Sequence, residues 1–123
     1  MGRLLSVLVV AAAIFAPSVS LASDDLLSGL WRVSGKVASF NFNVTCRLER
    51  HGEELEGACL EDKGKVHPIT AGSVDGDKVT WTHEGHFLLK SFNVVYSAVV
   101  HDGAMHGEMS AAGHSGAFTA AKV

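Results

Sequence analysis

The chain has 123 residues, of which 47% are hydrophobic, and its ten basic residues are outnumbered by 13 acidic ones. No run of basic residues interrupts this acidic balance, which argues against nucleic acids and anionic lipid surfaces as partners. A chain of this size suits one small domain rather than several.

The first 22 residues have the three parts of a secretory signal peptide. Arg3 supplies the positive charge, residues 4–16 form an apolar stretch, and Ser20 and Ala22 are small residues of the kind that precede a cleavage site. The apolar stretch is too short for a transmembrane helix. We therefore expect residues 1–22 to be removed as a signal peptide. Residues 23–123 would then form one exported domain, periplasmic or extracellular, with no membrane contact after cleavage.

From residue 29 onward, apolar and polar residues alternate between turn residues, which is typical of antiparallel β-strands. The clearest hairpin joins residues 40–48 to residues 54–60 through a two-residue Gly52-Glu53 loop. Such a loop places Cys46 directly opposite Cys59, and the sequence therefore predicts a disulfide bond across this hairpin. An even pair of cysteines in an exported protein favours the same bond.

Two more hairpins follow in the chain. One spans residues 68–83, and the other spans residues 91–112, where a two-residue Asp102-Gly103 loop sets Val100 opposite Met105. With a first and a last strand added, the domain has about eight strands joined by short turns. We therefore expect an all-β fold, an antiparallel up-and-down barrel, with a two-sheet β-sandwich as the alternative that strand pattern leaves open.

Two short motifs carry a family resemblance. Gly29-Leu30-Trp31 begins the first strand, and "VTWT" at residues 79–82 lies in a strand near the middle of the domain. They resemble motifs of the calycin barrels, the group of lipocalins, fatty-acid-binding proteins and avidins, in which the Trp of G-x-W plugs one end of the barrel. The resemblance implies a small barrel that holds a ligand inside. With only Trp31 and Trp81 present, the tryptophan-lined box of a biotin site cannot be assembled, so biotin binding is not implied.

The inward face of the expected barrel mixes aromatic residues with small ones. Gly57, Gly72, Ala98 and Gly107 share that face, and small residues beside aromatic ones can leave a cavity. We therefore expect the protein to bind or carry a small apolar ligand in its interior. The candidate ligand-binding residues are Phe42, Trp81, His83, Phe92, Tyr96, Met105, Met109 and Phe118.

A barrel whose side chains fill its interior is the alternative, since small barrels are often packed solid. The protein would then be a non-enzymatic interaction module, an inhibitor or an envelope accessory factor, that contacts a protein partner through its loops. Residues 84–90 are the candidate loop, because Phe87, Leu88 and Leu89 break the alternation of strand residues there.

Histidines and carboxylates give little sign of chemistry. The Asp102-Gly103 loop brings His101, His106 and Glu108 together as candidate zinc ligands, but on the outer face of the barrel, where water surrounds them. "HEGH" at residues 83–86 lacks the helical spacing of zinc proteases. No nucleophile motif and no inward pair of acids appears. We therefore expect no catalytic residue, no metal and no cofactor.

Overall fold

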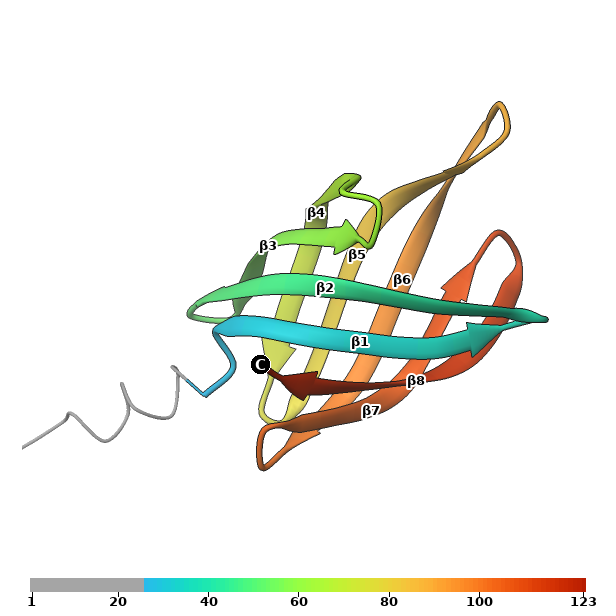
Figure 1. The fold of residues 1–123 in the computed structure, drawn as a ribbon. Coiled ribbons are helices and arrows are strands. Elements are labelled where there is room, and N and C mark those ends of the chain that lie inside the picture. The colour runs from blue at the N-terminus through green and yellow to red at the C-terminus, as the bar shows by residue number, and fades with distance from the viewer. Residues whose placement is uncertain (1–25) are drawn as a thin grey trace, which may run out of the picture.

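Eight antiparallel strands form one closed barrel in a computed structural model, which describes residues 26–123 (Figure 1). Each strand pairs with the next along the chain, and the last pairs with the first. The barrel prediction is confirmed, and the alternative of a two-sheet sandwich is wrong. The predicted signal peptide lies outside the described residues. The strands are β1 (Gly29–Val37), β2 (Phe40–His51), β3 (Glu54–Glu61), β4 (Val66–Asp75), β5 (Lys78–Phe87), β6 (Lys90–His101), β7 (Ala104–Ala111) and β8 (His114–Lys122).

The predicted register of both two-residue hairpins is confirmed. In the β2–β3 hairpin, Cys46 lies opposite Cys59 and the two form a disulfide bond, with their Cα atoms 3.9 Å apart. In the β6–β7 hairpin, Val100 lies opposite Met105. Strand register is fixed here because a shift of one residue would turn every buried side chain toward water.

The two halves of the barrel, β1–β4 and β5–β8, repeat one design. β2 and β6 are each 12 residues long, and β3 and β7 are each 8 residues long. Equivalent residues pair alike, since Gly35 lies opposite Phe42 and Gly85 lies opposite Phe92. The identical residues, always 50 positions apart, are Trp31 and Trp81, Gly35 and Gly85, Phe42 and Phe92, Asn43 and Asn93, Val44 and Val94, His51 and His101, Gly57 and Gly107, and Ala71 and Ala121.

Two of these repeated glycines lie where neighbouring strands come closest. A Cβ on Gly57 would stand 1.8 Å from the carbonyl oxygen of Arg47, and one on Gly107 would stand 2.0 Å from that of Ser97. The missing side chains therefore admit the backbone of the next strand, as at the corners of strongly coiled sheets. They leave no room for a ligand, contrary to our expectation that small residues here open a cavity.

Large side chains fill the centre of the barrel, as is common in barrels of eight strands. Trp31 and Trp81 are both 0% exposed, and Trp31 donates a hydrogen bond from Nε1 to the carbonyl oxygen of Leu27 at 2.8 Å. Among residues 26–123 there is no helix long and apolar enough to cross a membrane. The other large side chains that are almost fully buried are Tyr96, Phe118, Leu48, Leu55 and Met105.

Candidate ligand-binding site at the mouth of the barrel

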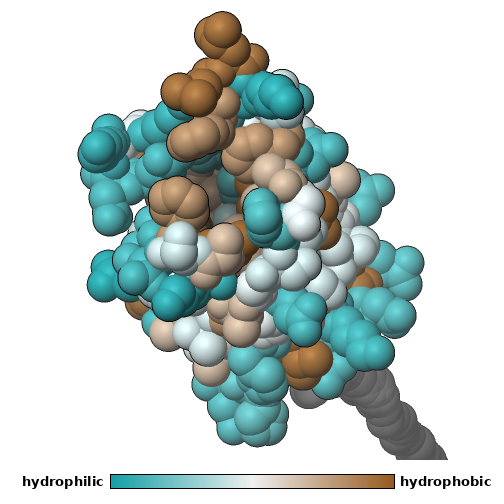
Figure 2. Space-filling model, turned by 90° about the vertical axis from the view of Figure 1, so that its right-hand side faces the viewer, coloured by the Kyte–Doolittle hydropathy of each residue, from teal (hydrophilic) through white to brown (hydrophobic). Residues whose placement is uncertain are grey.

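The two ends of the barrel differ in character. Turns at residues 38–39, 62–65, 88–89 and 112–113 gather at one end, which we call the mouth, because alternate turns of an antiparallel barrel lie at the same end. Figure 2 shows the mouth, with the apolar tip of the β5–β6 hairpin at the top and paler brown side chains below it around a hollow. Each turn at the opposite end consists of one glycine and one acidic residue: Gly52-Glu53, Gly76-Asp77 and Asp102-Gly103.

Two glycine–phenylalanine pairs stand at the mouth, one in each half. The ring of Phe42 lies across Gly35, where a Cβ would come within 2.7 Å of it, and the ring of Phe92 lies across Gly85, where a Cβ would come within 2.9 Å. Both phenylalanines are only half-buried. Each glycine therefore lets an aromatic ring lean over the neighbouring strand and leaves part of the ring open to solvent at the mouth.

A chain of polar side chains runs from the mouth into the interior. It starts at Glu61, whose carboxylate Oε2 lies 2.5 Å from Nε2 of His67, and the Glu61 side chain is 45% exposed. The imidazole rings of His67 and His83 are stacked, with centroids 5.0 Å apart. Both histidines are buried, His67 at 7% and His83 at 4% exposure. Below, "the polar chain" denotes Glu61, His67, His83 and Tyr96.

His83 connects this chain to the aromatic centre. Its Nδ1 lies 2.9 Å from the carbonyl oxygen of Glu84, so Nδ1 carries the proton, and Nε2 accepts a hydrogen bond from the Tyr96 hydroxyl at 3.1 Å. Burial lowers the pKa of His83 below its ordinary value, which keeps the ring neutral. Burial likewise raises the pKa of Tyr96, so its hydroxyl stays protonated and donates.

The polar chain ends at an unsatisfied donor. The Tyr96 ring stacks on Trp81 with centroids 4.7 Å apart, and Phe118 meets both rings edge-on. Trp81 is fully buried, and its Nε1 has no hydrogen-bond partner within residues 26–123. An unpaired buried donor costs free energy, so this indole is a position where an acceptor atom would be stabilised.

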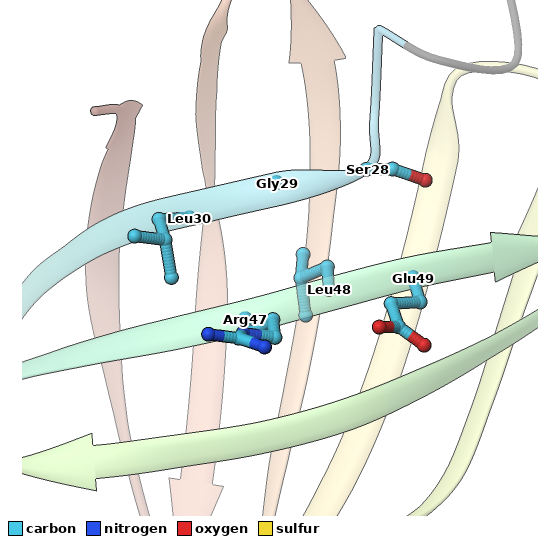
Figure 3. Close-up of a pocket in the computed structure, with 6 residues that line it drawn as sticks. All are labelled: Ser28, Gly29, Leu30, Arg47, Leu48 and Glu49. Carbon is cyan, nitrogen blue, oxygen red and sulfur yellow. The ribbon is translucent and has the colours of Figure 1, made fainter.

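Two grooves on the surface differ in what they offer a ligand. One, of about 610 Å³, lies beside the mouth and includes Phe42, Phe118 and Gly35 together with Lys36 and polar residues of β1, β2 and β8. The other, of about 450 Å³, lies along β1 and β2 beside Leu30, Arg47 and Glu49 (Figure 3). Leu48 also lines the second groove but is fully buried. Phe118 likewise lines the first groove but is only 2% exposed. The first groove therefore offers the half-buried ring of Phe42, and the second offers mainly a single leucine between charged side chains.

The predicted ligand-binding residues divide between the centre and the mouth. Phe42 and Phe92 lie at the mouth and are half-buried. The other candidates are packed against one another in the core and are at most 6% exposed: Trp81, His83, Tyr96, Met105, Met109 and Phe118.

Sequence reasoning missed Glu61 and His67. His67 lies opposite Cys59 on the inner face of β4, where the strand is interrupted by a register shift between Ile69 and Ala71. That irregularity breaks the alternation from which inward positions are read. The placement of His67 directly across from a cysteine predicted to face inward is the signal that could have found it.

The candidate zinc ligands lie where the sequence places them, on the outer face. His101, His106 and Glu108 are all exposed, and His101 Nε2 lies 3.2 Å from Asp102 Oδ2 with both side chains at least 80% exposed. Within residues 26–123, no three His, Cys, Asp or Glu side chains are grouped so that they could hold a metal ion.

No protein-family model and no curated protein sequence matches this chain. The closed barrel of eight antiparallel strands is compatible with a calycin-like fold.

Proposed function

We propose that the protein is an exported, non-enzymatic, calycin-like barrel that binds a small apolar ligand at its mouth. The observation that carries this proposal is the pair of half-buried rings, Phe42 and Phe92, each leaning over a glycine at the open end. Small-molecule sites are concave and are lined mainly by apolar and aromatic side chains, so partly exposed aromatic rings at an open end favour binding of an apolar ligand. The Cys46–Cys59 disulfide supports export, because such bonds are typical of proteins in oxidising compartments.

The mouth is favoured over the deep interior because the interior has no free space of a ligand's size at its glycines. Six of the eight predicted ligand residues are themselves buried, whereas Phe42 and Phe92 pack against the core and keep part of their rings exposed. A ligand that reached them would have to displace large side chains, and overpacking a core is costly. We therefore place the ligand against Phe42 and Phe92 and the rim of the 610 Å³ groove.

The polar chain supports selectivity at this site. His83 lies two residues further into the barrel than Gly85 on the same strand, and its ring is held by Glu84 and Tyr96. Burying two histidines and a tyrosine hydroxyl in a small core is costly unless each is paired. A ligand with a polar group beside an apolar body would meet this chain beneath Phe92, because the His83–Val94 pair lies one step deeper than the Gly85–Phe92 pair.

The proposal is tested with the apolar fluorescent probe N-phenylnaphthylamine, whose emission rises when it leaves water. We expect Phe42→Ala and Phe92→Ala each to weaken probe binding by about tenfold, the loss of one well-buried aromatic contact. Leu30→Ala is the matched control, because Leu30 is an exposed apolar residue on the outer face of β1.

Thermal unfolding followed by circular dichroism confirms that each variant is folded. If the wild-type protein does not bind the probe, or if Leu30→Ala weakens binding as much as the two phenylalanine variants, the proposed site is wrong.

A further inference from the structure

The tip of the β5–β6 hairpin is the most exposed apolar surface at the mouth. Phe87, Leu88 and Leu89 are 64%, 86% and 103% exposed, and they follow one another in the chain. This hairpin extends beyond the other strands (Figure 1), and its tip forms the brown projection at the top of Figure 2. Phe40, at the end of the β1–β2 turn, is also 69% exposed at the mouth. Consecutive exposed apolar residues on a projecting tip indicate a surface that contacts a partner.

Local geometry does not account for Leu88. Its φ is +58°, in the left-handed region that glycine and asparagine adopt most readily in two-residue hairpin loops. A bulky side chain is strained there, and it gains no burial in return because it is 86% exposed. Glycine or asparagine would serve the turn better. The leucine is therefore explained by what it contacts outside the barrel rather than by the stability of the fold.

Charges are divided between the two ends of the barrel. At the mouth, the exposed lysines Lys36, Lys63, Lys65 and Lys90 come from three different turns and outnumber the nearby carboxylates Glu61, Asp62 and Glu84. The opposite end carries Arg50, Lys78 and Lys122 against a larger group of carboxylates. These are Glu49, Glu53, Glu54, Glu56, Asp75, Asp77 and Asp102.

We propose that the mouth docks on a lipid bilayer surface with anionic headgroups, with Phe87, Leu88 and Leu89 inserted between the lipids. Apolar tips gain free energy when they enter the headgroup and acyl boundary, and lysines beside them are attracted by anionic lipid. The long lysine side chains can extend toward the phosphates while their apolar stems remain in the boundary. The acidic end would be repelled, so the charge division orients the barrel with its mouth toward the bilayer.

This inference is independent of the proposed small ligand, because it depends on the hairpin tip and the lysines rather than on Phe42 and Phe92. A second copy of the chain is the competing occupant, since the basic mouth of one molecule could meet the acidic end of another. The experiment therefore measures binding to vesicles and self-association separately.

Leu89→Trp provides the first measurement, because both native tryptophans are fully buried and a tip tryptophan would be the exposed one. We expect its fluorescence to shift to shorter wavelength on vesicles of equal parts phosphatidylcholine and phosphatidylglycerol. We expect little shift on phosphatidylcholine alone. Asp77→Trp, at a turn of the opposite end, is the matched reporter and should show no shift on either vesicle.

Co-sedimentation with the same anionic vesicles provides the second measurement. We expect Leu88→Asn/Leu89→Asn to lower the partition coefficient by more than about tenfold, the loss of two buried leucines. We expect Lys63→Gln/Lys65→Gln to lower it by about fivefold per lysine. Leu30→Asn and Lys78→Gln remove the same residue types elsewhere and should leave it unchanged. Leu88→Asn alone should raise the melting temperature, because asparagine suits the turn.

Three results would overturn the proposal. The first is equal binding of wild type and Leu88→Asn/Leu89→Asn to anionic vesicles. The second is a blue shift of Asp77→Trp as large as that of Leu89→Trp. The third is concentration-dependent association without vesicles, seen by sedimentation velocity and lost in Leu88→Asn/Leu89→Asn, which would assign the tip to a second copy of the chain.

Discussion

The two halves of the barrel share a strand arrangement but differ in the residue pair that joins the second and third strands of each half. In β2 and β3 the register partners Cys46 and Cys59 form a covalent bond. Fifty residues later, in β6 and β7, the equivalent register partners are Tyr96 and Met109, which are large and uncharged. At this position β2 and β3 are joined by a covalent bond, whereas β6 and β7 are held by the packing of two large side chains. The same register can therefore be stabilised by a bond in one half and by aromatic burial in the other.

A second difference concerns polarity. His83 in β5 occupies the position that Val33 holds in β1, and both side chains are buried. The valine fits a purely structural interior, whereas the histidine joins the polar chain and contacts Tyr96. The polar chain therefore crosses the boundary between the two halves, with Glu61 and His67 contributed by β3 and β4 of the first half and His83 and Tyr96 by β5 and β6 of the second.

The largest expected effect is a loss of stability when the disulfide bond of the first half is removed. Replacing both Cys46 and Cys59 with alanine should lower the free energy of unfolding by about 3 kcal/mol, because the bond closes a short loop in the unfolded chain. For a domain of this size the melting temperature should fall by roughly 15 °C. Urea unfolding measures the change, and a loss below about 1 kcal/mol would contradict it.

Hydrogen exchange of the same variant sharpens the comparison. If the barrel unfolds as one unit, amide protection should fall in both halves alike. If amide protection falls only in β2 and β3, the two halves are instead stabilised independently.

A smaller effect compares the two equivalent tryptophans. Both are fully buried, so replacing either with phenylalanine removes a similar apolar area. Trp31 Nε1 donates to the Leu27 carbonyl, whereas Trp81 Nε1 lacks a partner in the described part of the chain. Trp31→Phe should therefore be more destabilising than Trp81→Phe by about 1–2 kcal/mol in urea unfolding. Equal costs would show that the Trp31 hydrogen bond contributes nothing net.

The smallest effect concerns acid stability. Since the pKa of His83 in the folded protein lies below its ordinary value of 6.5, the unfolded chain binds more protons at mildly acidic pH. Its contribution to stability is complete above pH 6.5 and is lost as the pH falls through the folded pKa. His83→Val/Tyr96→Phe, which gives β5 the residue of β1 and leaves no unpaired hydroxyl, should flatten the fall in urea midpoint between about pH 7 and pH 5.

Tyr96→Phe is the control for that measurement, because it keeps His83 buried and should retain the acid sensitivity. A double variant with the acid sensitivity of wild type would mean that His83 does not control it.

Much of the fold could be predicted because apolar and polar residues alternate along the β-strands of this sequence. Two-residue turns fix register, and the cysteines confirmed it at Cys46 and Cys59. The 50-residue repeat escaped notice because few identical residues survive, and they are scattered along the strands. His67 escaped because the irregular pairing of β4 hides its direction.

The site was less predictable than the fold. Alternation correctly placed Trp81, His83 and Tyr96 inside, but it carries no information on how tightly an interior is filled. Packing depends on which side chains meet across the barrel, and that is decided by tilt and closure rather than by any one strand.

The sequence alone therefore determined the strand order, the hairpin registers and the disulfide bond, since each depends on residues close together along the chain. Only the tertiary structure brought Glu61, His67 and His83 into one polar chain and gathered Lys36, Lys63, Lys65 and Lys90 at one end. In the sequence those lysines form no basic run, so the chain reads as acidic throughout. Barrel closure sorts alternate turns to opposite ends, and that sorting separates charges that the sequence interleaves.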